Sequence, residues 1–102
     1  MPGFVKMADL DELVSSGSKE VEHDGRVYAL FYQDGVVSAI DGICPHQGGP
    51  LADGPVEGTC VTCPWHGCQF DIRDGHSSLN GRVKQAVYEV KIEGRDVYVA
   101  TP

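Results

Sequence analysis

The chain has 102 residues, of which 41% are hydrophobic and 23% charged, a composition typical of one globular domain of ordinary size. No apolar run is long enough to span a membrane, and we expect no secretory signal, because the first residues lack both a basic and an apolar region. The net charge of −7, with ten acids and three bases among residues 1–57, disfavours a nucleic-acid partner, because phosphates bind basic faces.

The N-terminal residues predict a strand followed by a short helical segment. Residues 4–7 are expected to open a strand. In residues 9–14, acidic side chains come first and apolar ones recur at helical spacing, so one helical turn is expected to end near Gly17.

Two pairs of turn residues then divide a run of strands. Residues 19–23 alternate in polarity, and the Asp24-Gly25 pair that follows is a hairpin signal. Residues 27–32 are apolar on both faces, which predicts a central, buried strand. A second Asp-Gly pair, at 34–35, turns the chain into residues 36–40.

Two Gly- and Pro-rich loops carry the clearest chemistry. The first reads Cys-Pro-His-Gln-Gly-Gly-Pro and the second Cys-Pro-Trp-His-Gly, with sixteen residues between the first His and the second Cys. Two thiolates on one iron and two imidazoles on the other make an asymmetric 2Fe–2S cluster. We therefore predict an iron–sulfur site built from Cys44, His46, Cys63 and His66.

The ligand types also predict how such a cluster accepts an electron. Two thiolates and two neutral imidazoles leave an oxidised 2Fe–2S core near neutral, whereas four thiolates leave it dianionic. The less negative cluster is reduced more easily, at about −150 to +300 mV against about −400 mV for plant-type ferredoxins.

Other readings of the four residues stay open. A Cys2His2 set also binds zinc, although zinc fingers place both Cys before both His, on a helix that the Pro and Gly content here forbids. A catalytic Cys–His pair would not explain two similar loops. A disulfide framework, for which four Cys allow three connectivities, would leave both His unexplained.

The second half of the chain predicts further short strands. Residues 59–62 are β-prone and would place both loops at one end of a hairpin, and residues 69–72 leave the second loop as a strand. A turn follows at 74–75, and residues 76–86 are expected to be irregular.

The last strands complete the fold class. Residues 88–92 alternate in polarity, residues 93–96 form a turn, and residues 97–99 close the sheet. Strands at this spacing predict an all-β sandwich or small barrel. We expect residues 1–102 to form a single domain, with a cluster-binding subdomain at about residues 43–70 inserted between two strands.

The two loops resemble those of Rieske proteins, and the chain is most similar to the small Rieske ferredoxins of bacterial aromatic ring-hydroxylating dioxygenase systems. The resemblance rests on Cys-Pro-His-Gln-Gly-Gly-Pro-Leu and Cys-Pro-Trp-His-Gly-x-Gln-Phe-Asp and covers nearly the whole chain. It implies a Rieske-like antiparallel fold. It also implies one 2Fe–2S cluster, with Cys44 and Cys63 on one iron and His46 and His66 on the other.

The resemblance further implies a one-electron carrier rather than an enzyme. Its expected partners are a flavin-dependent NAD(P)H ferredoxin reductase and a terminal oxygenase. A reducing cytoplasm is expected, because no export signal is visible and two thiols are committed to metal. A monomer is also expected. One alternative is a Rieske-like small subunit of assimilatory nitrite reductase, and another is a zinc-stabilised binding module.

Some positions depart from the high-potential Rieske proteins of cytochrome bc complexes. Gly49 and Trp65 stand where that family has two further Cys joined in a disulfide, and Cys68 and Phe70 stand where it has hydroxyl groups. A thiol is a weak donor and Phe donates nothing. Fewer hydrogen bonds to the cluster predict a low potential, near roughly −150 mV.

The remaining cysteines and histidines are expected to have no ligand role. Cys60 lies in a strand pattern and is expected to be buried, Cys68 is expected only to pack, and His23 and His76 are expected at the surface. The residues expected to shield the cluster and to form an apolar rim around it are Trp65, Leu51, Pro50 and Phe70.

Overall fold

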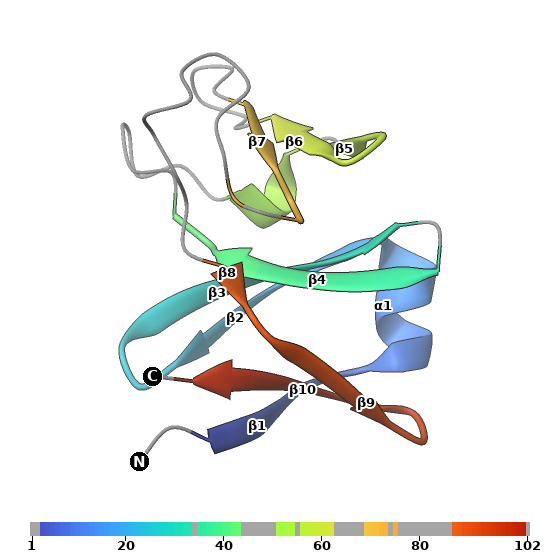
Figure 1. Cartoon of the computed structure of the whole chain (residues 1–102), viewed down its shortest axis with the longest axis vertical. Helices are drawn as coiled ribbons and strands as arrows, with labels where there is room; N and C mark the ends of the chain where they lie inside the picture. The colour runs from blue at the N-terminus through green and yellow to red at the C-terminus, as the bar shows by residue number, and fades with distance from the viewer. Residues whose placement is uncertain are drawn as a thin grey trace.

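The computed structural model describes residues 3–33, 35–43, 51–54, 56–62, 69–73, 75 and 87–101. Their strands form three antiparallel sheets, stacked as three layers (Figure 1). The lower sheet has the order β1-β10-β9, the middle sheet β2-β3-β4-β8 and the upper sheet β5-β6-β7. In chain order the elements are β1 (Gly3–Asp9), α1 (Leu10–Ser16), β2 (Ser18–His23), β3 (Arg26–Gln33), β4 (Val36–Asp41), the 3-10 turn η1 (Leu51–Asp53), β5 (Val56–Glu57), β6 (Cys60–Thr62), β7 (Gln69–Asp71), β8 (Val87–Tyr88), β9 (Val90–Glu93) and β10 (Asp96–Thr101).

Strand β3 is covered on both faces, which confirms the prediction of a central buried strand. Successive side chains of a strand point to opposite faces. Tyr28 and Leu30 therefore pack towards the lower sheet, whereas Ala29 and Phe31 pack towards the upper sheet. This double burial is the reason for the continuous apolar run in the sequence.

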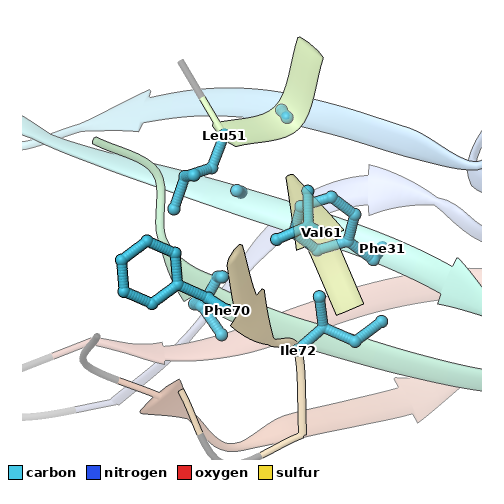
Figure 2. Packing of buried hydrophobic residues seen from close by; sticks show 8 residues of the cluster. Phe31, Leu51, Val61, Phe70 and Ile72 are labelled. Atoms are coloured by element: carbon cyan, nitrogen blue, oxygen red, sulfur yellow. The ribbon is translucent and has the colours of Figure 1, made fainter. Parts of the chain in front are cut away.

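The three stacked sheets enclose two hydrophobic cores. The lower core, between the lower and middle sheets, contains the buried side chains of Met7, Ala8, Leu13, Tyr28, Leu30, Ala39, Val97 and Val99. The upper core, between the middle and upper sheets, contains those of Ala29, Phe31, Ile40, Leu51, Ala52, Val61, Phe70 and Ile72 (Figure 2).

The predicted helix and first hairpin are confirmed. Helix α1 ends at Gly17, whose φ of 83° is left-handed and whose N–H donates to the Leu13 carbonyl at 2.7 Å. The β2–β3 turn is formed by Asp24 and Gly25, with φ of 52° and 76°. Positive φ at both central positions is the geometry that an Asp-Gly pair favours.

The C-terminal strands differ from the sequence expectation. Residues 88–92 were expected to form one strand, but β8 pairs with β4 in the middle sheet and β9 pairs with β10 in the lower sheet. Alternating polarity cannot show that a segment passes from one sheet to another, since each half keeps its own inward face. Strand β10 also pairs with β1, so the two ends of the described chain lie side by side (Figure 1).

The upper sheet and η1 lie between β4 and β8 in the chain. The all-β fold class is confirmed. The turn residues Asp34 and Asp74 and the segment 76–86 lie outside the described residues. No helix in the described ranges has the length and apolar character needed to cross a membrane.

Candidate functional site

The four predicted ligands lie outside the described residues, and the structure shows the chain ends from which their loops begin and to which they return. The first loop leaves after Ile43 and returns at Leu51; the second leaves after Thr62 and returns at Gln69. Also outside the described residues are Gly49, Pro50, Trp65, Cys68 and His76.

The first loop is closed at its base by backbone hydrogen bonds. The N–H of Leu51 donates to the carbonyl of Gly42 at 2.9 Å, and the N–H of Gly42 donates to the carbonyl of Val27 at 2.9 Å. A Cβ on Gly42 would lie 2.7 Å from Val27 Cγ1 and 3.0 Å from the Tyr28 carbonyl carbon. A residue without a side chain is therefore needed where β4 enters the loop.

The second loop connects the antiparallel pair of strands β6 and β7. Thr62 and Gln69 are paired across the hairpin, and the Gln69 Nε2 donates to the Thr62 Oγ1 at 3.3 Å. The loop therefore begins and ends at one position of the upper sheet.

The bases of both loops meet in the upper core. Leu51 comes from the base of the first loop, and Val61 and Phe70 come from the two strands that carry the second (Figure 2). All three side chains are fully buried. Each loop contains one Cys and one His in the sequence, so two loops with their bases packed together would fit the donor set of a cluster with two Cys and two His ligands.

Leu51 and Phe70 do not contribute an exposed apolar rim, because both side chains are fully buried in the upper core. The expectation for Cys60 was also wrong. This free cysteine is half-buried, because Val61 occupies the core-facing position and its neighbours in β6 point the other way. His23 is partly exposed, as expected, with its Nε2 3.9 Å from Asp24 Oδ2.

A charged group lies on the strand that follows the second loop. Asp71 accepts hydrogen bonds from the Arg73 side chain, at 3.0 Å to its Oδ2 and 3.2 Å to its Oδ1, and from Thr59 Oγ1 at 3.3 Å. The hydrogen bonds from Arg73 are the main cause of a lowered pKa for the Asp71 carboxyl.

The lowered pKa predicts a pH dependence of stability. The folded chain holds Asp71 ionised more firmly than the unfolded chain does, so this contribution is present at neutral pH and is lost on acidification below about pH 5. In Asp71→Asn, we expect the free energy of unfolding to fall less steeply between pH 5 and pH 2 than in the wild type, by less than about 1 kcal/mol. Urea unfolding at each pH measures this difference.

The control for this prediction is Asp24→Asn, whose side chain is 94% exposed. An Asp71→Asn variant with the same pH slope as the wild type would show that the Asp71–Arg73 pair does not contribute to acid sensitivity.

A second polar group lies on β3, β4 and β8 of the middle sheet and was missed by sequence reasoning. The Arg26 Nη1 donates to the Tyr88 hydroxyl at 3.1 Å, and the Tyr88 ring packs edge-on against Tyr28, with centroids 4.8 Å apart. Burial raises the pKa of Asp41, while the nearby Arg26 opposes this shift. No motif connects these residues, since three different strands bring them together.

Comparison with known proteins gives a family match over most of the chain. The model of the Rieske [2Fe-2S] domain family matches residues 3–99. The chain is 33% identical over 98 residues to a biphenyl dioxygenase ferredoxin subunit from a Pseudomonas species, covering 94% of this chain and 90% of that protein. It is 30% identical over 95 residues to the ferredoxin component of naphthalene 1,2-dioxygenase/salicylate 5-hydroxylase systems from a Ralstonia species, covering 92% and 91%.

Some relatives are much longer than this chain. The cholesterol 7-desaturase of Hemicentrotus pulcherrimus is 35% identical over 75 residues, but the match covers 72% of this chain and only 16% of that protein. For a related desaturase from Ciona intestinalis, the matched share is 15% of its length. The chain thus corresponds to a small part of these larger proteins.

Solved structures show the same fold. A ferredoxin of Sphingomonas yanoikuyae has a TM-score of 0.88 and 26% identity, covering 98% of this chain and all of that one. The ferredoxin–oxygenase complex of carbazole 1,9a-dioxygenase contains a chain with a TM-score of 0.86 and 25% identity, covering 95% and 92%. A protein described as a nitrite reductase small subunit, from Mycobacterium tuberculosis, has a TM-score of 0.89 at 24% identity, covering 100% and 97%.

Proposed function

Because the chain belongs to the Rieske [2Fe-2S] domain family and carries one Rieske 2Fe–2S cluster, we propose that it is a one-electron carrier that serves a terminal Rieske oxygenase. Electrons would come from a flavin-dependent NAD(P)H reductase and pass to an aromatic ring-hydroxylating dioxygenase. The observation that carries this proposal is the pair of Cys/His loops whose bases are packed together in the upper core.

We assign the ligands by residue type. Cys44 and Cys63 would hold one iron, and His46 and His66 the other, as the family resemblance implies. The cluster supplies one-electron chemistry when bound. The two imidazoles would form the outer edge at which a partner docks, as the family resemblance implies.

The potential is proposed to lie at the low end of the Rieske range, near roughly −150 mV. Phe70, which stands where high-potential members have a hydroxyl donor, is fully buried in the upper core and donates no hydrogen bond. Cys68 offers at most a weak donor.

The proposed partners are supported by what the relatives are. Two relatives that the chain covers almost completely are ferredoxin components of dioxygenase systems, and a structural relative is a ferredoxin bound to its oxygenase. The net charge of −7 favours partners with basic docking faces. Docking that must be repeated at each electron transfer belongs to the small, transient class of interfaces.

We also propose how the chain is organised and where in the cell it acts. The chain would act as a single-domain monomer in the cytoplasm, with the cluster-binding subdomain at about residues 43–70, and would catalyse no reaction itself.

The alternative is a tightly bound small subunit of nitrite reductase, which the fold match to the Mycobacterium tuberculosis protein keeps open. Many such subunits lack the full ligand set, whereas this sequence has all four ligands, which favours a carrier.

The purified protein tests this proposal directly. We expect a brown protein with two irons and two sulfides per chain, and a dithionite-reduced form whose EPR signal has a lower average g than an all-Cys ferredoxin. It should be reduced by NADH and a flavin ferredoxin reductase, and should then pass electrons to a Rieske oxygenase.

Two results would contradict the proposal. A colourless protein with one zinc per chain would show a zinc module. Stable co-elution with a nitrite reductase large subunit on gel filtration, together with no electron transfer to an oxygenase, would show a subunit rather than a carrier.

A further inference from the structure

Gly54 lies where the bases of the two loops touch. It is buried and directly follows η1, and its N–H donates to the Leu51 carbonyl at 3.0 Å. A Cβ at this position would overlap the carbonyl oxygen of Thr62 and lie 2.9 Å from the Thr62 carbonyl carbon. Because both obstructing atoms belong to the backbone of β6, no side-chain rotation could make room.

Turn η1 is held from two further sides. The Oγ of Ser18, at the start of β2, donates to the Ala52 carbonyl at 2.8 Å in a partly buried position. The N–H of Leu51 joins the turn to Gly42 at the other end of the first loop. The turn is thus fixed to the middle sheet while Gly54 lies against Thr62, the last described residue before the second loop.

We propose that Gly54 is a positioning residue for the cluster, because its backbone contact with Thr62 sets the distance between the bases of the two loops. The inference rests on the proposed function, since it requires each loop to supply one Cys and one His. Each iron then depends on both loops, so a change in their separation alters the ligand geometry and the amide groups around the sulfurs. These factors set the potential of an iron–sulfur cluster.

The test compares Gly54→Ala with Gly58→Ala. Gly58 lies in the β5–β6 turn of the same sheet with a φ of 63° and open space around it, so alanine strains the sheet there without touching the junction. We expect Gly54→Ala to lose iron to a chelator at least about threefold faster than Gly58→Ala. Its visible circular dichroism and EPR g values should also differ from the wild type, whereas those of Gly58→Ala should not.

A milder pair of variants keeps the test valid if Gly54→Ala does not fold. Ser18→Ala removes the hydrogen bond to η1, and Ser16→Ala removes an exposed one of the same length, 2.8 Å, to the Ser18 carbonyl. We expect Ser18→Ala to retain the cluster but to change its reduction equilibrium constant by about threefold, which is ~30 mV at 59 mV per tenfold change. Ser16→Ala should leave the potential unchanged.

The outcomes separate this inference from the proposed function. If Gly54→Ala and Gly58→Ala behave alike, and Ser18→Ala has the wild-type potential, Gly54 does not position the cluster, although the wild-type EPR signal still identifies a Rieske centre. If the wild-type protein has no such signal, the proposed function fails before the variants are compared.

Discussion

Replacing His66 with Cys is expected to lower the midpoint potential by a few hundred millivolts or to abolish the cluster. The substitution exchanges a neutral imidazole for a thiolate, which makes the cluster more negative and harder to reduce. The potential should move from roughly −150 mV towards the roughly −400 mV of all-Cys ferredoxins. Spectroelectrochemical titration of the purified variant measures this change.

The control is His23→Cys, which makes the same substitution at the β2–β3 hairpin, where the side chain is partly exposed and lies beside Asp24. It should have the wild-type potential and iron content. A His66→Cys protein with an unchanged potential would remove His66 from the ligand set, and the assignment of His46 to the same iron would then need independent evidence.

Replacing Phe70 with Ala is expected to cause a large loss in the free energy of unfolding. Its side chain is fully buried in the upper core, among residues from the middle sheet, η1 and β6. Phe→Ala at such a site costs about 3–5 kcal/mol, through lost burial and the cavity that remains. Small domains are stable by only about 5–15 kcal/mol, so Phe70→Ala should unfold at a much lower urea concentration.

The matched control is Phe4→Ala, because Phe4 is 42% exposed and contacts Lys91 across the surface of the lower sheet. Its cost should stay below about 1 kcal/mol. Equal losses in the two variants would show that the upper core contributes little to stability. Unfolding should be compared in cluster-free protein, so that ligand binding does not mask the difference in packing.

The chemistry of the candidate site could be predicted from the sequence because it depends on residue types and their short-range spacing. A Cys and a His separated by one or two residues in a Pro/Gly-rich loop indicate a metal ligand pair without reference to the fold. The comparisons confirm the cofactor that these loops predicted. Gly42 and Gly54 could not be distinguished from other glycines, since their role comes from segments distant in sequence that pass close to them.

By itself, the sequence determined the local elements: the helix that ends at Gly17, the Asp24-Gly25 hairpin and the doubly buried strand β3. These follow from turn chemistry and from side-chain periodicity, which act over a few residues. Only the tertiary structure decided that β1 pairs with β10, that residues 87–93 divide between two sheets, and that the two loop bases meet at Gly54 and Thr62. These contacts join segments far apart in the chain, and they form because the three layers must bury their apolar faces together.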